Sequence, residues 1–320
     1  MKHLITTGFA FLLLLRLSGQ VNLVPNPGFE IFDTCPNYSS QIKFAIPWFQ
    51  PNYPQLPFSS STDYFNVCNS NNTADVPQNF SGYQYPNTGN AYAGIAVFIY
   101  PSSTDGHEYI EVELDSALTN SHKYCVSFYL SLANSSCFPT SAIGIYFSQD
   151  TCQYGSWNYD PINVQPQLIN SSSNKISDTL NWAMLHWTHA PQDSQKFMTV
   201  GNFWWPSYNI PNSDSNCNAG ASYYYFDDFS IVRLPDIFAG NDLSINPGDS
   251  VMLQGSISEL WTGMQFEWLP HAGLNDPYNI VPNASPSITT TYTLTVSCST
   301  CNVPCLSEVV DSATVFVEPI

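Results

Sequence analysis

The sequence predicts an all-β protein built from two β-sandwiches in succession. Charged residues make up only 10% of the 320 residues, whereas 15% are aromatic and 24 are proline. Helical runs of Glu, Lys, Ala and Leu are missing, and short apolar runs alternate instead with stretches rich in Asn, Ser and Pro. Many short strands joined by polar connections are typical of antiparallel β-proteins.

The first residues are typical of a secretory signal peptide. Lys2 precedes an apolar run at residues 4–15, and small residues follow at Ser18 and Gly19. We expect cleavage of residues 1–19, which leaves Gln20 at the start of an exported, extracellular protein. A bacterial lipoprotein carries Cys at that position, so no lipid anchor is expected. No later segment has the ~20 apolar residues of a membrane span.

The charge of the chain excludes several classes of partner. Loss of Lys2 and Arg16 leaves five of the seven basic residues against all 25 acidic ones, a formal charge of −20. Proteins that bind nucleic acid or anionic lipid neutralise phosphates with Lys and Arg. The acidity therefore argues against both partners. It favours solubility outside the cell, together with attraction of divalent cations.

Residues 20–235 are predicted to form the first domain. Ile110, Val112 and Leu114 alternate with other residues, which predicts a strand with one buried face. Similar patterns predict strands at 124–131, 143–147, 197–200 and 223–232. The polar stretches 59–77, 148–174 and 207–219 are predicted to be loops at the ends of a sandwich, where binding residues are commonly carried.

Two carboxylates interrupt the aromatic strand predicted at residues 223–232. Side chains alternate across a strand, so one face is expected to carry Tyr225, Asp227, Phe229 and Ile231. A carboxylate on a buried face must be hydrogen-bonded, paired with a positive charge or bound to a cation. Few basic residues remain in this chain to act as partners. A bound Ca²⁺ is therefore a candidate at Asp227.

Residues 236–320 are predicted to form a small immunoglobulin-like sandwich. Short strands are predicted at 250–253, 266–268, 292–296 and 313–317, each with large apolar residues two positions apart. Turn sequences lie between them, among them Asn246–Asp249 and Gly273–Pro277. This even spacing of short strands and turns is typical of a sandwich with one buried face per strand.

Nine cysteines in an exported chain predict disulfides. Six lie before the domain boundary and three after it, so at most four bridges form and one thiol is left over. The spacing Cys298-x2-Cys301-x3-Cys305 resembles part of a zinc site but lacks a nearby fourth ligand. We therefore favour a disulfide or a loop role there over metal.

Two segments near the ends of the first domain resemble a known family. Asn22–Glu30, with the sequence NLVPNPGFE, and Tyr225–Ile231, with the sequence YFDDFSI, resemble the opening and closing strands of jelly-roll carbohydrate-binding modules. The resemblance implies a jelly-roll β-sandwich for residues 20–235. It also implies that Glu30 and Asp227, by their positions, help to hold a structural Ca²⁺.

Other segments resemble surface and secreted proteins of Bacteroidetes-type bacteria. In the first domain these are Asp63–Asn66, Gly89–Gly94, His107–Ile110 and Val200–Phe203. In the second domain the resemblance is to PKD/Ig-like repeats and rests on Ala239–Asp242, Pro247–Val251, Trp268–Pro270 and Thr289–Val296. A sorting domain for type IX secretion or a gliding-associated region usually follows such repeats. Neither occurs before Ile320, so attachment to the cell surface by that route is not expected.

The sequence offers no support for an enzyme. It contains neither G-x-S-x-G nor H-E-x-x-H. One predicted strand carries Glu108, Glu111 and Glu113, and we expect a solvated strand face, with Glu111 and Glu113 outward, rather than a glycosidase pair. His186 and His189 are expected to be partly buried and hydrogen-bonded rather than metal ligands.

Aromatic residues in the polar loops favour glycan binding. Sugar rings stack on aromatic faces, while amides and carboxylates bind the hydroxyls. The best candidates are Trp157, Tyr159, Trp205 and Tyr208, each of which could instead pack its loop onto the sandwich. We predict a non-catalytic adhesive protein whose partner is a polysaccharide or cell-surface glycan. The alternative is a structural spacer or assembly component that connects surface or secretion proteins, and a third possibility is a hydrolase with an unrecognised site.

Overall fold

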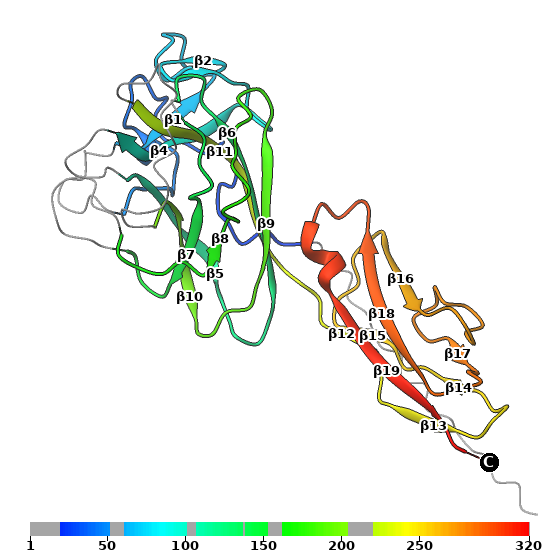
Figure 1. Ribbon diagram of the computed structural model, residues 1–320. Coiled ribbons are helices and arrows are strands. Elements are labelled where there is room, and N and C mark those ends of the chain that lie inside the picture. Colours follow the sequence, from blue (N-terminus) through cyan, green and yellow to red (C-terminus); the bar gives the residue numbers. More distant parts are fainter. Residues whose placement is uncertain are drawn as a thin grey trace, which may run out of the picture. The chain divides into compact units, whose positions relative to one another are not determined.

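The computed structural model describes residues 20–51, 61–100, 107–136, 138–152, 162–203 and 220–319 (Figure 1). The chain divides into two compact units, one spanning Val21–Leu234 and the other starting at Pro235. Within the described ranges the helical elements are two short 3-10 helices, η1 (Ile42–Phe44) and η2 (Pro304–Glu308), so the predicted all-β class is confirmed. No helix in these ranges is long and apolar enough to cross a membrane.

The first unit is a sandwich of two antiparallel sheets. The larger sheet has the spatial order β1 (Asp63–Asn66), β4 (Ala91–Tyr100), β11 (Gly220–Arg233), β6 (Tyr124–Leu132) and β9 (Ala183–His189). The smaller sheet has the order β5 (Tyr109–Leu118), β10 (Gln195–Gly201), β7 (Gly144–Ser148) and β8 (Leu168–Ile169). The main core draws on both sheets, with Phe128 from the larger and Ile110 and Met198 from the smaller. β1 and β8 lie in stretches that we expected to be loops.

The larger sheet is buried on both faces, which explains why β11 is so rich in aromatic residues. Tyr224 and Phe226 belong to the main core, whereas Tyr223 and Tyr225 belong to a second cluster on the opposite face. The segment before β4 packs onto this second cluster, since the ring of Phe80 contacts that of Tyr223 at 5.9 Å. This segment contains the small hairpin of β2 (Gln78–Asn79) and β3 (Gly82–Tyr83).

A β-bulge at Asp227 and Asp228 corrects the predicted assignment of faces. The register of β11 against β6 shifts directly after Asp227, and Asp228 has a positive φ of 49°. An extra residue in one strand reverses the alternation of its side chains. Phe229 and Ile231 therefore lie in the main core, while Tyr225 lies on the opposite face. The prediction that these residues share one face was wrong, although Asp227 is fully buried.

The second unit is a small sandwich. Its four-stranded sheet has the order β13 (Leu243–Ile245), β19 (Val310–Val317), β18 (Thr290–Cys298) and β16 (Met264–Leu269), with β13 parallel to β19. Two-stranded sheets join β12 (Ile237–Phe238) to β15 (Ser256–Ile257), and β14 (Val251–Met252) to β17 (Asn283–Ala284). The fully buried core includes Trp268, Tyr292, Leu294 and Val315. The four predicted strands are all present.

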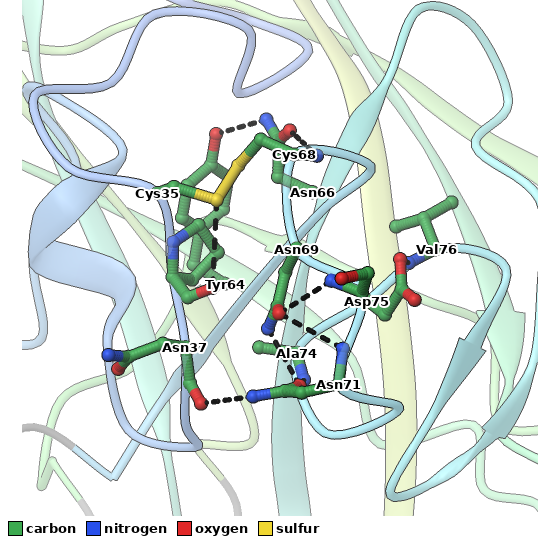
Figure 2. Close-up of a disulfide and its surroundings, with 12 residues drawn as sticks. Cys35, Asn37, Tyr64, Asn66, Cys68, Asn69, Asn71, Ala74, Asp75 and Val76 are labelled. Carbon is green, nitrogen blue, oxygen red and sulfur yellow. Dashed lines mark hydrogen bonds between the residues drawn. A yellow bond between two sulfur atoms is a disulfide. The ribbon is translucent and has the colours of Figure 1, made fainter.

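Disulfides are present in both units, as predicted. Cys35 bonds to Cys68 (Figure 2), and Cys298 bonds to Cys301, so these last two sulfurs are not zinc ligands. Cys125 and Cys305 are disulfide-bonded as well. Cys152 is a buried free thiol, in agreement with an odd number of cysteines. Cys137 and Cys217 lie outside the described residues.

Candidate functional site

The two ends of the first unit lie side by side. The backbone N–H of Leu23 donates to the carbonyl of Ile231 at 2.9 Å, and that of Phe229 donates to the carbonyl of Pro27 at 3.0 Å. The side chain of Asn22 donates to the carbonyl of Phe229 and accepts from the N–H of Ile231, residues that are 207 and 209 positions away. The opening and closing segments singled out in the sequence therefore meet in the fold.

Three acidic side chains lie next to Gly28 where these ends meet, and Glu30, Asp227 and Asp228 are called the clamp below. Gly28 lies against all three. A Cβ on Gly28 would lie 3.3 Å from Oδ1 of Asp228, 3.5 Å from Oδ1 of Asp227 and 3.9 Å from Cγ of Glu30. The structure thus brings the two predicted metal ligands, Glu30 and Asp227, to one place. Asp228 is a further member that the sequence prediction did not include.

Donors from a single loop between β3 and β4 hold the two aspartates of the clamp. The N–H groups of Asn87 and Thr88 donate to Oδ2 of Asp227 at 2.8 and 3.3 Å. The Asn87 amide and the Thr88 hydroxyl each donate to one oxygen of Asp228 at 2.7 Å. Asp228 also donates its own N–H to Oδ1 of Asp227 at 2.8 Å. Neutral donors therefore take the place of the missing basic side chains.

Glu30 binds the far end of the same loop. Its Oε1 accepts the N–H groups of Asn90 at 2.7 Å and Ala91 at 3.1 Å. Glu30 is exposed, whereas Asp227 is fully buried. The clamp therefore has one buried end and one end that faces solvent, so an ion could reach it from outside.

Burial governs the electrostatics of the clamp. It raises the pKa of Asp227 to about 8, with the charge of Asp228 adding to the effect and backbone hydrogen bonds opposing it. A carboxyl in such a place gains either a proton or a cation. Oxygen donors are the ligands that Ca²⁺ prefers, so the donor chemistry suits calcium. In the described part of the chain no three His, Cys, Asp or Glu side chains stand ready as a metal site, and calcium stays a prediction.

The predicted glycan-stacking residues cannot be placed in this arrangement. Trp157, Tyr159, Trp205 and Tyr208 all lie outside the described residues. Phe203, two residues before Trp205, is buried next to Tyr109 with ring centroids 5.1 Å apart. The prediction for the four loop aromatics therefore remains a prediction.

Glu111 is buried, contrary to the solvated strand face that we expected. Its side chain points away from the main core, but the N–H of Cys152 donates to both of its oxygens at 3.2 Å and the Thr199 hydroxyl donates at 2.5 Å. Glu113 is exposed, as expected, and pairs with Lys196 at 2.8 Å. The segment that covers Glu111 lies 41 residues away, so the alternation of one strand could not reveal its burial.

Glu108 is buried as well, and it forms a carboxyl pair with Asp63. Only 5% of Glu108 and 3% of Asp63 are exposed. Glu108 accepts the N–H of Ala96 at 2.7 Å, while Asp63 accepts the N–H of Ser40 and the hydroxyl of Tyr223 at 2.5 Å each. Burial raises the pKa of Asp63 to about 8, with the charge of Glu108 adding to it, and burial raises the pKa of Glu108 to about 7. Near neutral pH, protonation therefore neutralises the carboxyl groups of this pair in place of a basic side chain.

The two histidines of β9 do not form a joint site. Nε2 of His189 lies 2.7 Å from Oε1 of Gln195, and its buried ring stacks on Phe147 at 4.6 Å, as expected of a buried, hydrogen-bonded histidine. Burial lowers the pKa of His189. His186 is exposed, which differs from the partly buried position that we expected for it.

Comparison with known proteins gives no family for this chain. No family model matches the sequence, and no curated protein matches it. Among solved structures, the K2 cleaved adhesin domain of Lys-gingipain is 11% identical with a TM-score of 0.31, covering 64% of this chain and 95% of that domain. The K1 cleaved adhesin domain of Lys-gingipain from Porphyromonas gingivalis W83 is 10% identical with a TM-score of 0.30, covering 64% and 94%. Similarity at this level carries no argument about function.

Proposed function

We propose that this chain is an exported, non-catalytic adhesive protein that binds glycans and whose jelly roll is stabilised by calcium. One observation carries the non-catalytic part of the proposal. Asp63, Glu108 and Glu111, three carboxyl groups of the first unit with a raised pKa, are buried and hydrogen-bonded, while large aromatic side chains are exposed on its surface.

Glycoside hydrolysis needs two carboxyl groups that flank a sugar at about 5–10 Å from each other. Asp63, Glu108 and Glu111 are 3%, 5% and 0% exposed. Each accepts hydrogen bonds from the protein itself. A polysaccharide chain on the surface cannot reach them, so they serve the structure of the sandwich.

Binding by aromatic stacking has the needed side chains. The loop residues Trp157, Tyr159, Trp205 and Tyr208 are the binding residues proposed from the sequence. We expect the intact protein to bind at least one polysaccharide on an array of plant, algal and bacterial glycans, and Trp205→Ala and Tyr208→Ala to weaken that binding. Turnover of any glycan contradicts the non-catalytic proposal, and an array without any binding favours a spacer or assembly role instead.

Calcium belongs to the same proposal through the clamp. Glu30 and Asp227 would hold the ion, with Asp228 beside them, and its charge would replace the proton on Asp227. An ion there would join the opening segment of the sandwich to its last strand, because Gly28 and Asp227 come from the two ends of the unit. Its role would be stability rather than contact with a ligand.

A further inference from the structure

The hairpin formed by β2 and β3 has an inverted pattern of burial. Its polar residues point inward, with Asn79 3%, Ser81 4% and Gln84 5% exposed. Its tyrosines point outward, with Tyr83 49% and Tyr85 62% exposed, while Phe80, 47% exposed, packs its ring against Tyr223. Strands at the surface of a protein normally show the reverse pattern, with apolar side chains inward. The sequence therefore places large rings in solvent at the expense of apolar burial.

The inward polar residues fix the hairpin to the larger sheet. Asn79 donates to the hydroxyl of Tyr92 at 2.9 Å and accepts from the hydroxyl of Tyr225 at 2.8 Å. Gln84 donates to the hydroxyl of Ser131 at 3.0 Å. These bonds are buried, so they hold the backbone of the hairpin in one position. The backbone that carries the outward rings is therefore held in place.

A disulfide braces the chain just before the hairpin. Cys68 is bonded to Cys35, and the Asn71 side chain donates to the carbonyl of Asn37 at 2.7 Å (Figure 2). Both links join the same two loops, which tightens the approach to β2. A rigid surface loses little conformational entropy when it binds a ligand.

Two aromatic side chains of this region contact each other directly, and a third bonds to the backbone beside them. The Tyr83 hydroxyl donates to the Tyr85 hydroxyl at 3.1 Å, and their rings lie 5.6 Å apart at an angle of 89°. Trp182, directly before β9, donates its indole N–H to the backbone carbonyl of Tyr85 at 2.9 Å. The exposed side chain of Asn134 accepts the N–H of Tyr83 at 2.7 Å, so an amide borders the rings. Tyr83, Tyr85 and Trp182 are called the aromatic platform below.

We propose that the aromatic platform is a binding site for a neutral polysaccharide. The inference rests on the proposed glycan binding and assigns it a place. Rings whose hydroxyls and a neighbouring amide remain at the surface match both the flat C–H faces and the hydroxyls of pyranose sugars. Fixed aromatic side chains also present a large contact area at low entropic cost.

Charge selects a neutral ligand over an anionic one. The exposed carboxylate of Asp178 accepts the N–H groups of Leu180 and Asn181, directly before Trp182. These bonds lower the pKa of Asp178, so it is ionised at neutral pH. The whole chain carries only seven basic residues against 25 acidic ones. A uronate or sulfate group near the platform would meet repulsion without compensation.

The test compares variants of the full-length protein on neutral and anionic polysaccharides. We use soluble xylan, glucomannan and mixed-linkage glucan as neutral probes, with alginate and chondroitin sulfate as anionic probes. Tyr83→Ala and Tyr85→Ala should each weaken binding to the neutral glycan about tenfold, and the double variant more. Both residues are exposed, so unchanged melting temperatures are expected. Tyr38→Ala, which removes a tyrosine that is 67% exposed elsewhere in the same unit, is the matched control.

The outcomes separate this inference from the proposed function. Loss of neutral-glycan binding in the platform variants, with Tyr38→Ala retaining it, supports the platform, whether or not the loop variants also weaken binding. Binding that survives Tyr83→Ala and Tyr85→Ala but is lost in Trp205→Ala overturns the platform and leaves glycan binding intact. Binding to anionic glycans alone, or to a protein partner through the platform, overturns the neutral ligand. Absence of binding to every glycan overturns both proposals.

Discussion

The clamp and the Asp63–Glu108 pair accommodate buried carboxyl groups without basic partners in two different ways. Both place carboxyl groups in a unit that has few basic side chains, and both satisfy them with neutral donors. The Asp63–Glu108 pair is shut off from solvent on both members, so only protons can neutralise it. The clamp opens to solvent at Glu30 and brings three acidic side chains next to Gly28. Solvent access therefore decides whether a buried acid depends on pH alone or can also depend on a cation.

The largest expected effect is a loss of stability of the first unit at high pH. The pKa of Asp63 and that of Glu108 are raised to about 8 and about 7 in the fold, so the folded state holds protons that the unfolded chain releases near pH 4. Their stabilising contribution is complete below pH 4 and is lost as pH rises through 7 to 8, on the order of several kcal/mol. Urea unfolding between pH 5 and pH 9 measures it. Asp63→Asn with Glu108→Gln should make the curve shallower, with the remaining slope expected from Asp227, and a wild-type curve that rises over this range contradicts the assignment.

A smaller and opposite effect is expected from calcium at the clamp. Ca²⁺ competes with the proton on Asp227, whose pKa is raised to about 8, so the ion should stabilise the unit at pH 9 and hardly at pH 5. At a concentration 100 times its Kd the gain is about 2.7 kcal/mol. Melting curves with Ca²⁺ and with EDTA test this. Glu30→Ala and Asp227→Ala should abolish the response and Asp63→Asn should keep it, while identical curves with and without EDTA remove calcium from the clamp.

The smallest effect is expected from a single hydroxyl. Tyr223→Phe removes the donor to Asp63 and should cost about 1–2 kcal/mol, with a larger cost at pH 9, where the carboxylate is ionised. Tyr225→Phe is the matched control, because its hydroxyl donates to the neutral amide oxygen of Asn79. Its cost should be the same at both pH values. Equal pH dependence in the two variants would show that Asp63 does not titrate in this range.

Local sequence patterns predicted the strands but not the β-bulge that interrupts the alternation of side chains in β11. Alternating apolar residues located β5, β6, β10 and β18 within a few residues, because burial of one face imposes that spacing. The bulge at Asp228 depends on a single left-handed residue, and no apolar period records it. Its signal was the Asp-Asp pair itself, since Asp tolerates a positive φ better than most residues.

Site residues were predictable only where two distant segments carried a shared motif. Glu30 and Asp227 were named together from their motifs, and the fold brings them together at Gly28. The donor loop at Asn87 to Ala91 was not named as their partner, because contacts made across the fold leave no local trace. The aromatic platform was missed for a different reason. In sequence, a short hairpin with outward aromatic residues cannot be distinguished from a polar loop that contains a few aromatic residues. Burial of Asn79 and Gln84 is what distinguishes it.

The donor loop also sets the path along which the first unit would carry a mechanical load. Tyr85 of the platform lies two residues before Asn87, and the N–H of Asn87 is bonded to Asp227 on β11. β11 runs to Arg233 and leads directly into the second unit at Pro235. Tension on a ligand held at the proposed platform would therefore reach β11 both through the Asn79–Tyr225 bond and through the clamp. Under the proposed adhesive function, the clamp would be one of two joints that carry such a load.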